Sequence, residues 1–260
     1  MWPIYVINLD RVPARLAESR ARLDAAGLAF RRVRAVDGRM LTEDQLRRVG
    51  APRPRFAKRP VTPAEVACFL SHRKAWAEIA AGDAPVAVVL EDDFVLEPGA
   101  ARILERLARL PCTWDMLKLY SDGARPMVEA VPLAGGYRIG TPLVLPPTTV
   151  AYAITRPAAR ALTALPPSIA WPIDLYLKRW WEHGASIKVV EPAVVRPDER
   201  HGLTSSIDES RRRMRANVVL RFLRNAAYQL DFRYRMHRYA AMRATRPRWP
   251  ETEPEGSGGA

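Results

Sequence analysis

Cysteine is nearly absent from the sequence, which has only Cys68 and Cys112 among its 260 residues. Two cysteines exclude a disulfide-stapled scaffold. Long apolar runs are also lacking, so no segment is suited to crossing a membrane. The N-terminus has no basic leader and carries polar residues from Asn8 onward, which argues against a signal peptide. Together these absences predict a cytoplasmic protein.

Lysine is scarce as well, at five residues, so arginine supplies nearly all of the positive charge. The formal net charge is +13, and twelve arginines fall within residues 211–248, where only Asp231 opposes them. The rest of the chain is close to balanced. This concentration predicts a local contact with an anionic surface, such as the inner face of the cell membrane, and argues against nucleic acid as the partner.

The length and a hydrophobic content of 48% are enough for one large domain. Apolar runs predict strands at 4–9, 30–36, 84–90, 114–120, 148–155 and 187–190, with a β-hairpin or active-site loop at 123–147. Helical periodicity predicts helices at 13–26, 42–49, from Thr62 onward, and at 100–110, 157–165, 172–183 and 208–242. Strands that alternate with helices indicate an α/β fold with a mostly parallel sheet flanked by helices.

Three acids, Glu91, Asp92 and Asp93, directly follow the apolar run at 84–90. Such a run is typical of a strand covered on both faces, and ligands of open α/β sheets bind at the carboxyl ends of the strands. Because successive strand residues point to opposite sides, Glu91 and Asp93 are expected on one side and Asp92 on the other. A divalent metal is the natural partner for such carboxylates, although a solvated loop that caps the next helix is the alternative.

The helix from Thr62 has a cap residue followed by Pro63 and, three residues after the cap, Glu65, which predicts a capping box. Its apolar face is interrupted by His72 and Arg73. A histidine on a helix often serves structure alone, but this polar pair inside an apolar helix favours a functional role.

Several segments, taken together and in order, resemble glycosyltransferase family 25, the family of bacterial lipopolysaccharide glycosyltransferases and the collagen galactosyltransferase domain. They are Ile7-Asn8-Leu9-Asp10-Arg11 with Arg15, Ala35-Val36-Asp37-Gly38-Arg39, Cys68 to Trp76, Val89 to Asp93, Ala151-Tyr152 and Ile173-Asp174. The most specific is Ser71-His72-Arg73 with Glu91 nineteen residues after His72. The likeness covers residues 3–207 and departs at Ala64, where the family usually has glycine.

The resemblance implies a GT-A-like fold in residues 1–207, a UDP-sugar donor, a divalent metal with Mn²⁺ expected, and inversion at the anomeric carbon. A metal neutralises the departing diphosphate, and one base must take the proton of the acceptor hydroxyl. The resemblance also implies that the enzyme transfers a hexose, with galactose expected, to a saccharide acceptor of lipopolysaccharide or another glycoconjugate. Residues 208–248 are then a basic helical segment beside the domain, and residues 249–260 a disordered tail.

The residue roles follow from the same resemblance. The expected metal ligands are Asp93, Asp92 and His201; the catalytic residues are Asp174, as general base, and Glu91; the nucleotide and diphosphate ligands are Asn8, Asp10, Arg11, Arg15, Asp37, His72, Arg73 and Asp92. Plain alternatives stay open: Asp10 as a helix cap, Asp37 as a turn residue, Asp174 as an ordinary first-turn acid, and His201 as a solvated loop residue.

Two other functions remain open. A metal-dependent nucleotidyltransferase also uses acidic metal sites, but it is expected to show a glycine-rich phosphate loop, and none follows the first predicted strand. A non-catalytic basic adaptor would bind a membrane or nucleic acid through residues 211–248, but it leaves the three acids unexplained.

Overall fold

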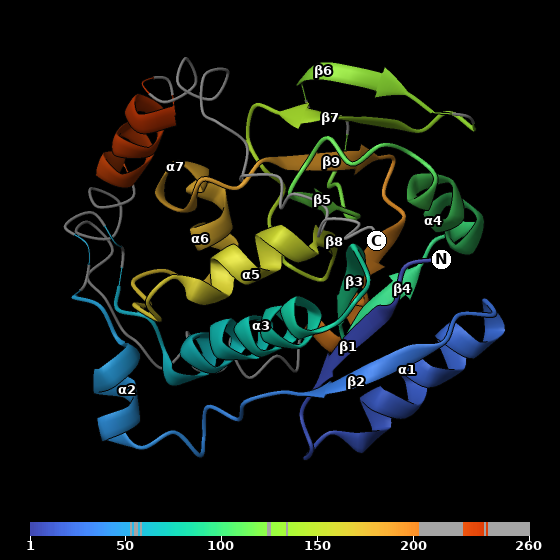
Figure 1. Ribbon diagram of the computed structural model, residues 1–260. Helices are drawn as coiled ribbons and strands as arrows, with labels where there is room; N and C mark the ends of the chain where they lie inside the picture. The colour runs from blue at the N-terminus through green and yellow to red at the C-terminus, as the bar shows by residue number, and fades with distance from the viewer. Residues whose placement is uncertain are drawn as a thin grey trace, which may run out of the picture.

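The computed structural model describes residues 1–52, 54, 57, 59–123, 126–133, 135–202, 226–236 and 238. At its centre lies an eight-stranded sheet in the order β2-β1-β3-β8-β5-β9-β7-β6 (Figure 1). Its strands are β1 (Ile4–Asn8), β2 (Phe30–Arg34), β3 (Val86–Glu91), β5 (Met116–Lys118), β6 (Met127–Pro132), β7 (Arg138–Pro142), β8 (Ala151–Thr155) and β9 (Ile187–Glu191). A separate two-stranded sheet pairs β4 (Phe94–Leu96) with β10 (Val195–Pro197).

The sheet is mixed, but one direction dominates. β1 pairs in parallel with β2 and β3, and β5 pairs in parallel with β9. β8 runs antiparallel to β3 and β5, and β7 runs antiparallel to β9 and β6. Six of the eight strands therefore point the same way, which confirms the predicted α/β class with a mostly parallel sheet. The reversal of β8 places the start of that strand beside the end of β3.

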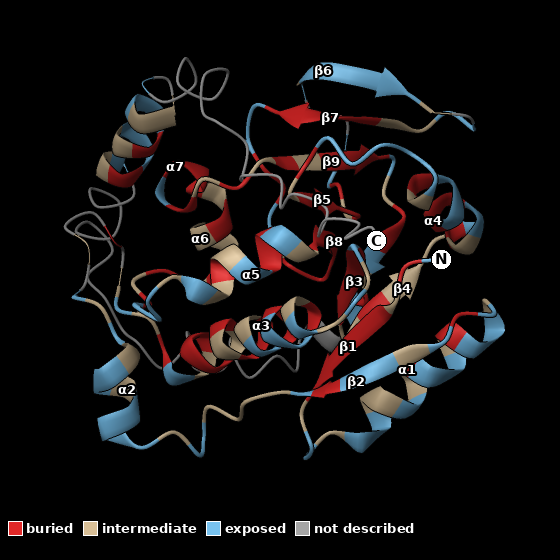
Figure 2. Ribbon diagram, in the orientation of Figure 1, coloured by how far each residue is buried: buried red, intermediate tan, exposed pale blue. Residues whose placement is uncertain are grey.

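Helices cover both faces of the sheet. On one face α1 (Pro13–Ala25) and α4 (Ala100–Ala108) pack on a core that includes Ile4 and Val6 of β1. On the other face α3 (Pro63–Ala81), α5 (Arg156–Ala164) and α6 (Ile173–Lys178) pack on a core that includes Tyr5 and Ile7. Strand residues thus alternate between two buried cores. Figure 2 shows β1 and β3 as largely buried strands. The remaining helices are α2 (Glu43–Val49), α7 (Trp180–His183) and α8 (Glu199–Gly202).

Helix α3 begins with the predicted capping box. The Thr62 hydroxyl accepts from the backbone N–H of Glu65 at 3.2 Å, and the Glu65 carboxylate accepts from the N–H of Thr62 at 2.9 Å. Pro63 occupies the first turn, and Arg59 pairs with Glu65 at 2.6 Å. These contacts satisfy donors that every helix start leaves open, and they fix the start of the helix that carries His72.

The prediction of one continuous helix at 172–183 is wrong. The chain breaks at Arg179, between α6 and α7, where φ is −91° and ψ is 47°. The Arg179 guanidinium stacks over the rings of Trp171, at 4.7 Å, and Trp181, at 5.3 Å, and pairs with Glu182. These aromatic and ionic contacts hold a backbone conformation that helical periodicity alone does not indicate.

The basic segment at the C-terminal end is described only for residues 226–236 and 238, where it is helical. In this part Tyr228 packs on Trp171, with ring centroids 5.6 Å apart, and Phe232 packs on Trp181 at 5.3 Å. The helix therefore lies against the domain beside α7 (Figure 1). The rest of the predicted helix at 208–242 and the predicted tail at 249–260 lie outside the described residues. Among the described helices none is both long and apolar enough to span a bilayer.

Candidate active site

The ends of β1 and β3 bring Asn8 and the middle acid together. Ile7 pairs with Glu91 in the parallel register, so the residues that follow each strand are neighbours. Asn8 Nδ2 donates to Asp92 Oδ2 at 2.7 Å and to the carbonyl of Val12 at 3.1 Å. The resemblance placed Asn8 in the site, and the structure joins it to the acidic triplet.

Arg15 of α1 bridges two of the acids. Its Nη1 lies 3.0 Å from Asp92 Oδ1, and its Nη2 lies 3.5 Å from Asp93 Oδ2. Both oxygens of Asp92 therefore have protein partners, one from Arg15 and one from Asn8. Asp92 is buried and acts as an anchor between β1, α1 and the end of β3.

Asp93 carries a charge that the protein compensates less well. Burial and the Glu91 carboxylate raise the pKa of Asp93 to about 7, against the opposing effect of Arg15. Glu91 acts on Asp93 more strongly than the adjacent Asp92 does. Because β3 ends at Glu91 and the other two acids lie in the turn that follows, the expected alternation of the three side chains stays a prediction. Two crowded carboxylates of this kind fit a divalent cation. The fit favours Asp93 and Glu91 as metal ligands over the predicted pair of Asp93 and Asp92.

Glu91 is held on the α3 side by two donors. His72 Nε2 lies 3.2 Å from Glu91 Oε1, and the Thr149 hydroxyl donates to the same oxygen. Burial alone would raise the pKa of Glu91, but these contacts with His72 and Thr149 outweigh it and lower the pKa. Oε2, the second oxygen of Glu91, accepts no hydrogen bond from the described residues. His72 thus positions Glu91, and the structure gives no support to its predicted contact with a diphosphate.

The orientation of the His72 ring follows from its other neighbours. Trp76 Nε1–H donates to the Tyr152 hydroxyl oxygen at 2.8 Å, and His72 Nδ1 lies 2.9 Å from that oxygen. The Tyr152 hydroxyl oxygen accepts from the indole N–H, and its own proton is available to His72 Nδ1. Because an ionised carboxylate can only accept, His72 Nε2 donates to Glu91. A buried chain from Trp76 through Tyr152 and His72 therefore fixes one oxygen of Glu91.

Arg73 turns away from the acids. Its guanidinium donates to the carbonyls of Leu165 at 2.7 Å, Thr163 at 2.5 Å and Leu162 at 3.3 Å. These carbonyls belong to the end of α5, where the last turn of a helix leaves carbonyl oxygens without backbone donors. The Arg73 guanidinium supplies the donors. Arg73 thus has a structural role, which argues against the predicted phosphate contact.

Three other predicted nucleotide residues lie at the ends of β1 and β2 and are already paired. Asp10 pairs with Arg34 at 2.6 Å and with Arg32 at 2.7 Å, and the hydrogen bond from Arg34 lowers the pKa of Asp10. Arg11 pairs with Asp37 at 2.7 Å. The alternative of Asp10 as a helix cap is wrong, because the N-cap of α1 is Val12 with no side-chain hydrogen bond.

Asp174 lies in the first turn of α6 and is half-buried. Its carboxylate acts on the thiol of Cys68 and the ammonium of Lys118, and Glu91 acts on the same two groups. Asp174 and Glu91 therefore border one region of the molecule, from α6 and from β3. His201 lies in α8, but its side chain is outside the described residues, so its predicted metal role stays a prediction.

Lys118 is a member of this region that the sequence did not indicate. Its side chain is 2% exposed, and Nζ donates to the carbonyls of Thr148 at 2.6 Å and Pro146 at 2.7 Å. Burial, together with the nearby Lys178, lowers the pKa of Lys118 to about 7. Thr148 has a left-handed backbone, with φ of 62°, and the next residue is the Thr149 that bonds Glu91. Lys118 thereby shapes the loop that reaches the acidic triplet.

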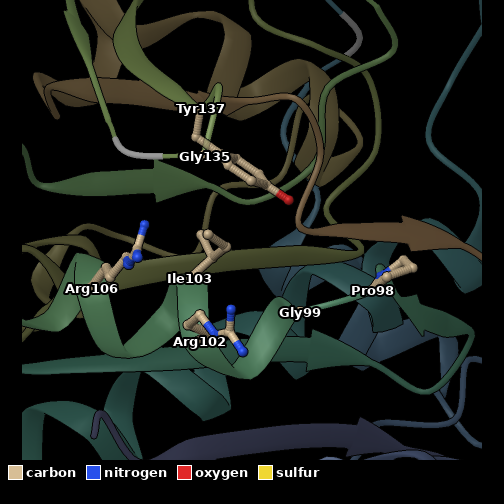
Figure 3. A pocket seen from close by; sticks show the side chains of 7 residues that line it. All are labelled: Pro98, Gly99, Arg102, Ile103, Arg106, Gly135 and Tyr137. Carbon is tan, nitrogen blue, oxygen red and sulfur yellow. The ribbon is translucent and has the colours of Figure 1, made fainter.

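A cavity of about 290 Å³ lies elsewhere, between α4 and the turn from β6 to β7 (Figure 3). Its lining consists of Pro98, Gly99, Arg102, Ile103, Arg106, Gly135 and Tyr137. Within the described part of the chain, Arg102 and Arg106 have no acidic partner. None of the predicted site residues borders this cavity, so it is separate from the acidic triplet.

The fold and this cluster define an α/β protein whose charged site lies at the carboxyl ends of neighbouring parallel strands. Residues 1–123, which include the triplet, match the family model described as glycosyltransferase family 25 (LPS biosynthesis protein). The chain is therefore a relative of glycosyltransferase family 25, as its motifs predicted, with the family match in residues 1–123.

Curated relatives carry the same family name. A "Glycosyltransferase 25 family member" of Aedes aegypti is 38% identical over 123 residues, which are 44% of this chain and 20% of that protein. An "Inactive glycosyltransferase 25 family member 3" of Homo sapiens is 32% identical over 190 residues, which are 67% of this chain and 31% of that protein. The chain thus spans between a fifth and a third of the length of these relatives.

Among solved structures, "Crystal structure of HddC from Yersinia pseudotuberculosis" is similar to 73% of this chain and 89% of its own, with a TM-score of 0.36 and 11% identity. This likeness is too low to assign a fold or a function.

Proposed function

We propose that the chain is an inverting, metal-dependent glycosyltransferase with a GT-A-like fold. It moves a hexose, with galactose as the expected sugar, from a UDP-sugar to a saccharide acceptor of lipopolysaccharide or another glycoconjugate. One observation carries the proposal: Glu91 and Asp93 lie at the end of β3, within the residues that the family model matches. Burial and the Glu91 carboxylate raise the pKa of Asp93, and a divalent cation would relieve this repulsion.

Asp93 and the Oε2 oxygen of Glu91 are the groups that would hold the divalent metal, with Mn²⁺ as the expected ion. The metal supplies positive charge that neutralises the leaving diphosphate. The protein's own residues prepare this site. Asn8 and Arg15 hold Asp92, while His72 and Thr149 hold Glu91, so the carboxylates keep their places before a ligand arrives.

Arg15 is the described arginine that contacts both Asp92 and Asp93. Its longer contact, 3.5 Å to Asp93, is weaker than its 3.0 Å contact to Asp92. Arg15 Nη2, which makes this weaker contact, would donate to a phosphate oxygen of the donor. Asp10, Arg11 and Asp37, at the ends of β1 and β2, are proposed to contact the nucleoside, and His201 of α8 is proposed as a further metal or phosphate ligand.

Asp174 is proposed as the general base. It borders the same region as Glu91, and its carboxylate can accept the proton of the attacking acceptor hydroxyl. The sugar is then attacked on the face opposite the diphosphate, which inverts the anomeric carbon.

The C-terminal helix is proposed to hold the protein at an anionic membrane surface, where a glycolipid acceptor is found. Its inner face, Tyr228 and Phe232, packs on the domain, whereas Leu230 and Tyr234 are 69% and 63% exposed. Arg233 and Arg238 are exposed on the same helix. An outward face with apolar, aromatic and arginine side chains suits the interface of an anionic bilayer.

A screen of UDP-hexoses with and without Mn²⁺ tests the catalytic proposal. A glycosyltransferase releases UDP and slowly hydrolyses the donor, whereas a nucleotidyltransferase supplied with pyrophosphate makes UTP and a sugar 1-phosphate. Because one matched human relative is named inactive, the screen has a third outcome, which is binding without catalysis. Metal-dependent binding without turnover, with any acceptor, would favour a binding role over an enzyme.

A further inference from the structure

Three potential metal ligands meet on the α3 side of the acidic triplet. Cys68 and His72 lie four residues apart on α3 and therefore on the same face of that helix. Glu91 reaches them from the end of β3. The thiol sulfur of Cys68, a ring nitrogen of His72 and a carboxylate oxygen of Glu91 all lie within 4.8 Å of one another.

The donor types indicate a particular class of cation. A sulfur, an imidazole nitrogen and a carboxylate oxygen are the ligands of Zn²⁺, whereas Mg²⁺ and Mn²⁺ prefer oxygen. Three protein ligands leave a fourth tetrahedral position for water or for a substrate oxygen. Among the described residues, this is the only group of three or more histidines, cysteines and acids placed to hold a metal ion.

The surroundings of the three ligands resemble the outer shell of a metal site. Tyr152 lies 2.9 Å from His72 Nδ1, so it can accept the Nδ1 proton when Nε2 binds a cation. Thr149 donates to Glu91 Oε1 and holds that carboxylate in place. Such contacts fix the orientations of the His72 ring and the Glu91 carboxylate.

The local charge also favours a cation. Burial raises the pKa of the Cys68 thiol, and the carboxylates of Glu91, Asp174 and Asp93 raise it further. A divalent cation beside these groups relieves their mutual repulsion, and the thiol proton leaves to solvent as the thiolate binds.

We propose that Cys68, His72 and Glu91 form a binding site for a thiophilic divalent cation, with Zn²⁺ as the best match, adjacent to the oxygen site at Asp93. Binding there breaks the hydrogen bond between His72 and Glu91 and takes up a carboxylate that the Mn²⁺ site shares. Zn²⁺ therefore inhibits donor turnover, a consequence that rests on the proposed function, whereas the binding itself does not.

Cobalt replaces Zn²⁺ as a visible probe in the full-length chain without any donor. Titration with Co²⁺ is expected to give one equivalent of a thiolate-to-cobalt charge-transfer band, which Zn²⁺ then displaces. The Cys68→Ser variant loses the band, and the Cys112→Ser variant keeps it. Cys112 is the matched control because it is the other free cysteine and is exposed. No band in the wild type, or a band lost only in Cys112→Ser, overturns the site.

A second measurement reads the consequence. If the chain turns over a donor with Mn²⁺, the Zn²⁺ concentration that halves the rate should rise at least about tenfold in Cys68→Ser, the scale for weakening a metal site. In Cys112→Ser it should not change. Equal sensitivity of both variants contradicts inhibition through Cys68. A chain with a cobalt band but no turnover contradicts only the catalytic proposal, so the two failures are distinguishable.

Discussion

Arg15 Nη1 lies 3.0 Å from Asp92 Oδ1, and this ion pair offsets the charge of the middle acid of the triplet. Asn8 holds the other oxygen of Asp92 at 2.7 Å. Asp93 has only a 3.5 Å contact with Arg15, and its charge is opposed by burial and by Glu91. The same residue type thus stabilises the fold at one position and costs stability at the next.

Replacement of each aspartate by asparagine should therefore have opposite effects in metal-free buffer at neutral pH. Asp92→Asn is expected to lower the free energy of unfolding by about 1.5–3 kcal/mol, the range for a hydrogen bond to a charged group. Asp93→Asn should leave it unchanged or raise it. Urea unfolding with a chelator present measures both. A larger loss in Asp93→Asn than in Asp92→Asn would contradict the assigned roles.

The pH dependence of the free energy of unfolding, compared between the wild type and Asp93→Asn, gives a second check on Asp93. Its pKa of about 7 in the folded protein lies above the ordinary value of 3.8, so the folded state binds more protons between these values. The stabilising contribution of this group is therefore present at low pH and is lost as the pH rises toward 7. The stability of the wild type relative to Asp93→Asn should fall across this window. A constant difference would show that Asp93 is not perturbed.

Lys118→Met tests the loop that carries Thr149. The change leaves the carbonyls of Pro146 and Thr148 without their donor, at a cost of roughly 1–3 kcal/mol for each buried group. Donor turnover should fall as well, because Thr149 no longer holds Glu91. Lys188→Met is the matched control, since this strand lysine bonds only the exposed Thr113. Its effect on unfolding should stay within about 0.5 kcal/mol. Equal losses in the two variants would remove Lys118 from the account.

Much of the fold could be predicted because it depends on local patterns. The capping box of Thr62 and Glu65, the buried strand before Glu91 and the first helix all have short-range signals, and all are present. The reversal of β8 is set by which strands pair, and strand pairing leaves no local pattern. That reversal brings Thr149 to the triplet, so the sequence did not indicate this residue.

The site was predictable in its acids and less so in its neighbours. A run of three acids after an apolar strand is visible in any reading of the chain. The role of Arg73 depends on where α5 ends, and the acceptor Thr163 in α5 lies ninety residues away from Arg73 in sequence. Lys118 stands in an apolar strand of a chain that has five lysines. A lysine in an apolar strand indicates a buried ammonium. The role of Lys118 is explained only by the carbonyls of Pro146 and Thr148, which accept hydrogen bonds from it.

Asp174→Asn tests the general base. Turnover in the presence of acceptor should fall about 10²-fold or more, because the base acts in the transition state. The affinity for the donor should be unchanged. Asp83→Asn, an exposed loop aspartate outside the site, is the control. If Asp174→Asn keeps full turnover, or if it weakens donor binding as much as it slows turnover, Asp174 is not the base.

Membrane attachment is tested in the full chain by charge reversal. Arg233→Glu with Arg238→Glu should reduce sedimentation with anionic vesicles about tenfold or more, since each arginine near such a surface contributes about 1 kcal/mol. Arg31→Glu with Arg109→Glu makes the same change in net charge on exposed arginines elsewhere in the fold and should have little effect. Wild-type binding should also weaken as salt rises. Equal loss in both double variants would indicate general attraction, not attachment by the helix.

Asp93 and Glu91 are proposed to hold a metal on which binding of the UDP-sugar depends. Calorimetric titration of UDP into the protein, with Mn²⁺ and with a chelator, is the most direct test. UDP should bind the wild type and Asp83→Asn only with Mn²⁺, and Asp93→Asn should lose this metal-dependent binding while it stays folded. Binding of UDP to Asp93→Asn with the same affinity and the same metal dependence as the wild type would contradict this role of Asp93.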